Sequence, residues 1–107
     1  MYQETICFDE AARQKVRHRI WKDEKIRGIK LVGYDEQLEA PLIEFDFENS
    51  QEPKAQEIGR RHNNVLSEQA HQDRINEGWT VTYSVAVGGK HPHSIVVLER
   101  DEWPDAV

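Results

Sequence analysis

The stretch Trp79–Leu98, WTVTYSVAVGGKHPHSIVVL, decides the fold that we expect. Large side chains alternate with small ones over Trp79–Val87, which is the two-residue period of a strand with one buried face. Gly88–Pro92 supplies turn residues, and Ser94–Leu98 is a second run rich in β-branched side chains. The stretch therefore predicts two antiparallel strands joined by a glycine-rich turn.

Upstream of this hairpin, the sequence alternates between strand and helix patterns. We expect strands over Tyr2–Phe8, Ile26–Tyr34 and Leu42–Phe47, the last two forming a hairpin around a polar loop at residues 35–41. Asp9 is placed as the N-cap of a helix over residues 10–22. The helix is expected to bury a narrow apolar stripe with four-residue spacing, formed by Ala12, Val16 and Ile20.

A second helix is predicted over residues 53–76. Pro53 suits a first helical turn, and Gly78 suits the position just after a helix end. Gly59 and Asn63 are poor helix formers, so a break near Asn63 is part of this interpretation.

The resulting order, β-α-β-β-α-β-β, predicts one α+β domain over residues 1–107. We expect a mostly antiparallel five-stranded sheet with two helices on one face. Two arrangements fit: a ferredoxin-like split βαββαβ, or a roll around one long helix. Whether residues 51–76 form one helix or two decides between them, and residues 100–107 are expected to form an acidic, loosely ordered tail.

The composition predicts a soluble cytoplasmic protein. The chain has 107 residues, 37% of them hydrophobic, and a mean hydropathy of −0.81. No apolar run is long enough to span a bilayer, and the N-terminus lacks the basic head and apolar stretch of a secretory signal. The single cysteine, Cys7, lies between Ile6 and Phe8, where a buried and inert thiol is expected.

The net charge of −6 argues against a general nucleic-acid binder, which needs an excess of Lys and Arg. The charge is nevertheless unevenly distributed. Residues 13–30 hold eight bases and two acids, and residues 31–57 hold eight acids and one lysine. These blocks could be ordinary solvated faces, could pair within the monomer, or could be complementary surfaces between chains.

Two sets of residues are candidate metal ligands. His91 and His93 are two residues apart, a spacing that points both side chains the same way in extended backbone and suits zinc. Glu44 and Asp46 share one strand face, with Lys30 expected on the neighbouring strand. Together they define an alternative function, a metal-dependent hydrolase or a metal-binding protein. Solvated polar residues of a turn and of a strand face are the simpler interpretation of both sets.

Other residues are candidates for ligand or nucleic-acid contacts. Trp79, Tyr83 and Phe45 could line a pocket, although core packing is the simpler interpretation. Arg60 and Arg61 could hold an anionic group. A second alternative function, nucleic-acid association, would use these two arginines with the 13–30 basic block, mainly Arg13, Arg17 and Arg19.

The leading hypothesis is a small non-catalytic binding or regulatory protein that acts as a homodimer. The sequence has no phosphate-binding loop, nucleophile elbow, zinc-protease motif or paired cysteines, so we expect no cofactor and favour a role other than catalysis. A dimer would cover a sheet face or the edge of the terminal strand. Its partners would be a second copy, another protein or a small molecule.

Overall fold

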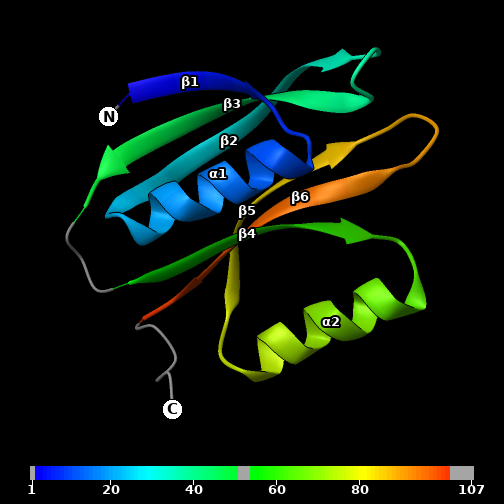
Figure 1. The fold of residues 1–107 in the computed structure, drawn as a ribbon. Coiled ribbons are helices and arrows are strands. Elements are labelled where there is room, and N and C mark those ends of the chain that lie inside the picture. Colours follow the sequence, from blue (N-terminus) through cyan, green and yellow to red (C-terminus); the bar gives the residue numbers. More distant parts are fainter. Residues whose placement is uncertain (1, 51–53, 102–107) are drawn as a thin grey trace.

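The computed structural model describes residues 2–50 and 54–101, which form six strands and two helices (Figure 1). The strands build two three-stranded antiparallel sheets, with orders β1-β3-β2 and β4-β6-β5. In chain order the elements are β1 (Tyr2–Cys7), α1 (Glu10–Trp21), β2 (Glu24–Asp35), β3 (Ala40–Asn49), β4 (Ala55–His62), α2 (Val65–Asn76), β5 (Thr80–Val87) and β6 (His93–Arg100).

The α+β class is confirmed, but the expected single five-stranded sheet is not what the chain forms. The error lies in residues 53–76, because Ala55–His62 is a strand and not the first half of a helix. Side chains two residues apart there, Gln56, Ile58 and Arg60, share one face and oppose alternate residues of β6. Of the expected helix, only Val65–Asn76 forms, so among the described residues of this stretch there is one helix; it begins after Asn64, which caps it by accepting a hydrogen bond from the Ser67 N–H at 2.9 Å.

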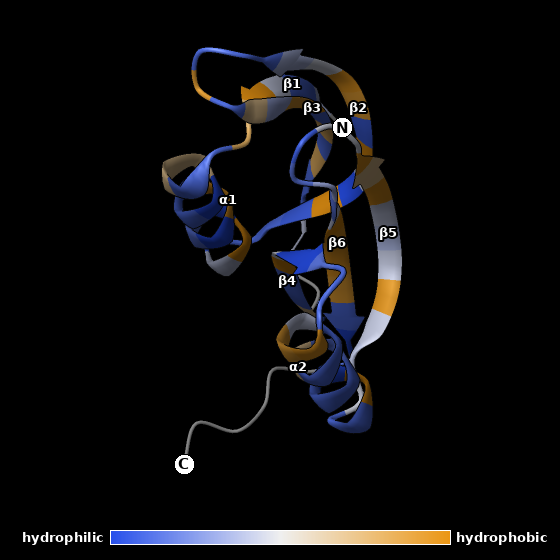
Figure 2. Ribbon diagram, turned by 90° about the vertical axis from the view of Figure 1, so that its right-hand side faces the viewer, coloured by the Kyte–Doolittle hydropathy of each residue, from blue (hydrophilic) through white to orange (hydrophobic). Residues whose placement is uncertain are grey.

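The terminal hairpin is confirmed as β5 and β6, and β6 becomes the central strand of the second sheet. Figure 2 shows β6 as hydrophobic along most of its length. Since β4 and β5 pair with its two edges, the terminal strand has no open edge on which a second copy could dock as the sequence suggested. The proposed acidic tail falls mostly on residues 102–107, which lie outside the described residues.

Helix α1 forms as the sequence predicts. Asp9 caps it by accepting a hydrogen bond from the Ala12 N–H at 2.8 Å, and Val16 and Ile20 are its buried residues. Helix α2 buries none of its residues completely, and most of its surface is hydrophilic (Figure 2). Neither described helix has the length and hydropathy needed to cross a membrane.

The main core lies between α1 and the facing sides of both sheets. Its buried members come from both sheets, from α1 and from the residue after β1: Phe8, Val16, Ile20, Ile26, Ile43, Phe45, Phe47, Ile58, Val87, Ile95 and Val97. A smaller cluster of Ala55, Trp79 and Leu98 lies elsewhere in the second sheet. Leu98 and Val96 line a groove together with α2, so α1 and α2 lie against opposite faces of this sheet and not on one face as predicted.

The outer face of the first sheet is polar. Glu44, Asp46 and Glu48 alternate along β3 with buried apolar residues and are half-buried themselves. The expected hairpin of these two strands is confirmed, and one of its sides is polar. Arg27 donates to Glu48 at 2.6 Å, so the basic and acidic blocks of the sequence make at least one contact within the monomer.

One buried amide joins the two sheets. The side chain of Gln56, only 1% exposed, reaches from β4 to the backbone of Ile26 on β2. The Ile26 N–H donates to Gln56 Oε1 at 2.8 Å, and Gln56 Nε2 donates to the Ile26 carbonyl at 2.9 Å. Gln56 thereby satisfies both backbone groups of a core residue that its neighbour strand β3 leaves unpaired.

We predict that Gln56→Leu lowers the free energy of unfolding by about 2–5 kcal/mol, because two buried backbone groups lose their partners. Urea unfolding followed by circular dichroism measures this difference. The matched control is Gln69→Leu, since Gln69 is exposed on α2 and donates to the exposed Asp73; its expected effect is below about 0.5 kcal/mol. Equal effects of the two substitutions would show that the Gln56 amide does not link the sheets.

Candidate functional site

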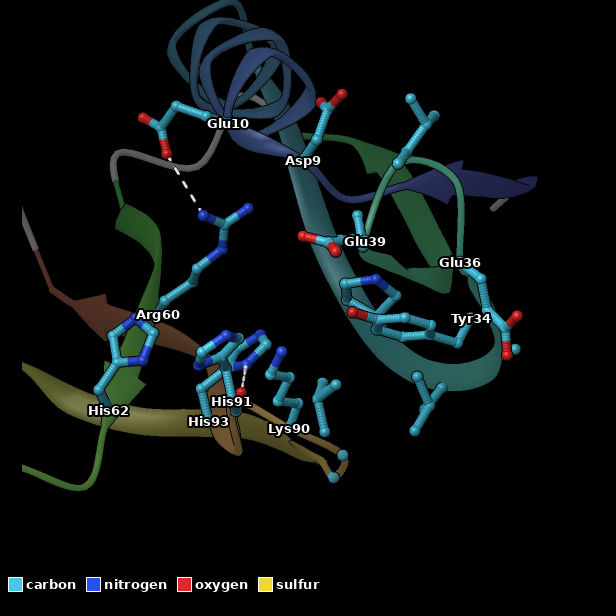
Figure 3. A pocket seen from close by; sticks show the side chains of 18 residues that line it. Asp9, Glu10, Tyr34, Glu36, Glu39, Arg60, His62, Lys90, His91 and His93 are labelled. Carbon is cyan, nitrogen blue, oxygen red and sulfur yellow. Dashed lines mark hydrogen bonds and ion pairs between the residues drawn. The ribbon is translucent and has the colours of Figure 1, made fainter.

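A cleft with a volume of about 1000 Å³ lies where four segments meet (Figure 3). These are the start of α1, the turn between β2 and β3, the end of β4 and the loop between β5 and β6. The cleft therefore depends on how the two sheets are joined. Its polar lining residues are Asp9, Glu10, Tyr34, Glu36, Glu39, Arg60, His62, Lys90, His91 and His93.

One wall of the cleft is basic, and Arg60 is its best-anchored member. Its Nη2 donates to the Phe8 carbonyl at 2.9 Å, and its Nη1 lies 3.5 Å from a Glu10 carboxylate oxygen. The guanidinium also lies 5.6 Å from the centre of the Phe8 ring. Its third nitrogen, Nε, is buried without a hydrogen-bond partner among the described residues. Arg60 is thus held in place from two sides with one donor still available.

Three histidines continue this wall. His62 and His93 lie opposite each other on β4 and β6, with ring centres 5.4 Å apart. His93 Nδ1 lies 3.0 Å from the His91 carbonyl oxygen, so an Nδ1–H donated there leaves Nε2 as the acceptor nitrogen. Within the described residues this buried Nε2 has no partner. Gly89, at φ +98°, allows the turn that brings His91 and Lys90 to the same rim.

The opposite wall is acidic (Figure 3). Glu36 and Glu39 come from the β2–β3 turn, which Asp35 holds by accepting the Gln37 and Leu38 N–H groups at 3.0 Å each. Asp9 comes from the start of α1, whereas its neighbour Glu10 lies on the side of Arg60, 3.5 Å from the Arg60 Nη1. The hydrogen bond from Arg13 and that from Gln14 lower the pKa of Glu10 to about 2, so this carboxylate is charged throughout the physiological range.

Apolar side chains lie between the charged walls. Leu31, Tyr34 and Leu38 belong to β2 and the following turn, Pro41 to β3, and Val87 to the end of β5. Tyr34 and Leu38 are exposed despite their size. The cleft therefore offers opposite charges on two sides and apolar surface between them, which is the usual composition of a small-molecule site.

The structure places only some of the predicted site residues in this cleft. Arg60, His91 and His93 line it. Phe45 is fully buried in the main core, Tyr83 packs against that core, and Trp79 is buried in the smaller cluster. Packing accounts for these three aromatic residues, as the simpler interpretation had it.

The other predicted residues lie elsewhere. Arg61 lines a second groove, between α1 and α2, and bonds to Glu68. Glu44 and Asp46 lie on the outer face of the first sheet and do not line the cleft with His91 and His93. Among residues 2–50 and 54–101, no three His, Cys, Asp or Glu side chains gather as metal ligands would. The metal hypothesis therefore gains no support from the geometry.

Sequence reasoning missed Tyr34, Glu39 and Lys90 as cleft residues. The available signal was that each lies next to a predicted turn or strand end, where loops collect binding residues. Cys7 is half-buried outside the cleft. Burial raises the pKa of its thiol, and the nearby Asp35 and Asp9 carboxylates raise it further, which agrees with an inert cysteine.

We predict a pH-dependent effect of Glu10→Gln on the melting temperature. The pKa of Glu10 in the folded chain lies below its ordinary value of 4.5, so its charge stabilises the fold above pH 4.5, and this contribution is lost as the pH falls towards 2. The variant should therefore melt below the wild type at pH 7, and the two should converge near pH 2. Glu36→Gln, at an exposed position of the same cleft, is the control and should change little at either pH. A constant difference for Glu10→Gln across this range would contradict the assignment.

Comparison with known proteins gives no further guide: no family model, no curated protein and no solved structure matches this chain. Its function is therefore argued from the chemistry of the cleft itself.

Proposed function

We propose that the protein is a small non-catalytic binding protein whose cleft takes a zwitterionic small molecule with an apolar body. The observation that carries the proposal is the separation of charge across the cleft. Arg60, Lys90 and three histidines lie on one side, and the carboxylates of Asp9, Glu36 and Glu39 lie on the other, while Glu10 pairs with Arg60 (Figure 3). Free amino acids and dipeptides are the ligand class that matches this arrangement.

A ligand with a single charge fits less well. With neutral histidines, the lining residues include two bases, Arg60 and Lys90, and four acids, so the cleft as a whole repels a simple anion. A simple cation would leave Arg60 Nε and the histidines without partners. A molecule with an ammonium group and a carboxylate interacts favourably with both walls, and its side chain can cover Tyr34 and Leu38.

The lining residues favour binding over covalent catalysis. Among the described residues that line the cleft there is no serine, threonine or cysteine that His62, His91 or His93 could activate as a nucleophile. Lys90 and Tyr34 remain exposed at the rim, where a nucleophile would not be shielded from water. We therefore keep the non-catalytic function as the proposal and metal-dependent hydrolysis as the less favoured alternative.

Homodimerisation stays a prediction. It is expected because a sheet face needs cover and because the two charge blocks are complementary, but the outer face of the first sheet is polar enough to face water. Exposed apolar residues are spread over different elements, among them Val32 on β2, Leu66 on α2 and Val81 on β5. None of these positions alone marks a dimer surface.

We predict that phenylalanine raises the melting temperature more than two matched compounds with one charge each, phenethylamine and 3-phenylpropionate. At about tenfold excess over its dissociation constant, a ligand adds about 1.4 kcal/mol of stability, which shifts the melting temperature by roughly 5–10 °C. A thermal-shift panel of amino acids and dipeptides measures this. Equal shifts from the singly charged analogues, or no shift from any zwitterion, would contradict the proposal.

Matched variants locate the site. Glu39→Gln and Lys90→Gln each remove one charge from opposite walls without disturbing a hydrogen bond that the structure shows, and each should reduce the shift. Lys15→Gln removes an exposed charge of α1 outside the cleft and should leave the shift unchanged. A shift that survives both cleft variants would place the ligand elsewhere.

A further inference from the structure

A second groove, which shares Arg60 and His62 with the cleft, runs along the open edge of β4. Strand β4 pairs with β6 on one side only, and among the described residues no other strand covers its far edge. Figure 1 shows β4 running between α1 and α2. The groove there has a volume of about 510 Å³, and residues of α1, β4, α2 and β6 line it. Here the edge of the sheet itself is the floor of a binding surface.

The backbone of β4 is oriented to pair with an added strand. The His62 N–H donates to Ser67 Oγ at 2.8 Å, and the His62 carbonyl accepts from the Asn64 N–H at 2.9 Å. Both groups therefore point away from β6. In an antiparallel ladder without a bulge, backbone direction repeats every second residue, so the N–H and C=O groups of Arg60 and Ile58 point to the same open edge. Such an edge can accept an extended peptide by strand addition.

The groove is strongly basic on a chain whose net charge is −6. Two arginines of α1, two of β4 and one of α2 line it, together with two histidines; they are Arg13, Arg17, Arg60, Arg61, Arg74, His62 and His71. Among the described lining residues the only carboxylate is Glu57, which pairs with Arg74 at 3.0 Å. Two further carboxylates, Glu10 and Glu68, pair with three of the other arginines. Together with Glu57 they make three carboxylates against the five guanidinium groups of the groove.

The two sides of the groove differ in chemistry. On the α1 side, Arg13 and Arg17 are four residues apart and so project from one face of the helix. On the α2 side, Leu66 is 84% exposed and lies with Ala70 over Val96 and Leu98. Neighbouring Val65 is 85% exposed. An added strand points alternate side chains to the two sides, so it meets cations on one and apolar surface on the other.

We propose that the open edge of β4 is a docking site for an extended acidic segment of a partner protein. Its acidic residues would alternate with apolar residues, the acidic ones facing Arg13 and Arg17 and the apolar ones facing Leu66 and Ala70. A peptide fits better than a nucleic acid, because the described residues that line the groove include no Phe, Tyr or Trp to stack on bases and because apolar residues form one side of it. Docking would also cover α2, which buries none of its residues completely.

Selection from a phage-displayed library of random octapeptides, equal in length to the eight residues of β4, tests this proposal. The full chain should enrich peptides in which Asp or Glu alternates with apolar residues. A synthetic copy of an enriched peptide should bind about tenfold more weakly to the Arg13→Gln/Arg17→Gln variant, as loss of close charge pairs implies. The control is Lys15→Gln/Lys22→Gln, which removes two exposed charges from the other side of α1 and should leave binding within about twofold.

Hydrogen exchange then tests the docking mode. The amides of Ile58 and Arg60 should gain protection when the peptide binds, because strand addition pairs them. Absence of acidic enrichment, equal affinity for the arginine and lysine variants, or unchanged exchange at Ile58 and Arg60 would each overturn the proposal. So would tighter, arginine-dependent binding of a twelve-residue oligothymidylate, which would assign the groove to nucleic acid.

Discussion

The paired hydrogen bonds between the Gln56 amide and the Ile26 backbone are the interaction on which the rest of the structure depends. They join two sheets that otherwise share a core without sharing a ladder. A glutamine amide offers one donor and one acceptor, which is what an unpaired residue of a buried strand requires. Because these groups lie in the core, leaving them unpaired would cost more free energy than most single apolar contacts supply.

The same link positions both candidate binding surfaces. Gln56 fixes the start of β4 against β2, so the end of β4 carries Arg60 and His62 to the turn between β2 and β3. The cleft exists because that turn and the β5–β6 loop come from different sheets. The other edge of β4 stays open between α1 and α2 and forms the basic groove. A single strand thus contributes to two surfaces, one suited to a small molecule and one to an extended peptide.

The elements that the sequence predicted best are those with a strong local period. The alternation over Trp79–Val87 and the capped stripe of Val16 and Ile20 specify a strand and a helix without help from distant residues. The prediction of a helix was wrong for residues 55–62, which form a strand. Gln56, Arg60 and His62 are polar residues on the core-facing side of that strand, so its sequence does not show the alternation of apolar and polar residues that indicates a strand. Only contacts with β2, Phe8 and β6 explain why polar residues are placed there.

For the cleft, the sequence identified residue types but not their proximity. Arg60, His91 and His93 could be named as candidates because their side-chain chemistry follows from the sequence alone, whereas their approach to Tyr34 and Glu39 depends on the packing of the two sheets.

The most direct test of this account is native-state hydrogen exchange at the Ile26 amide. If Gln56 holds the sheets together, this amide exchanges only through global unfolding and its exchange free energy equals that of the whole chain. Fast exchange through local opening, independent of denaturant, would show that the sheets separate without unfolding and would contradict the account.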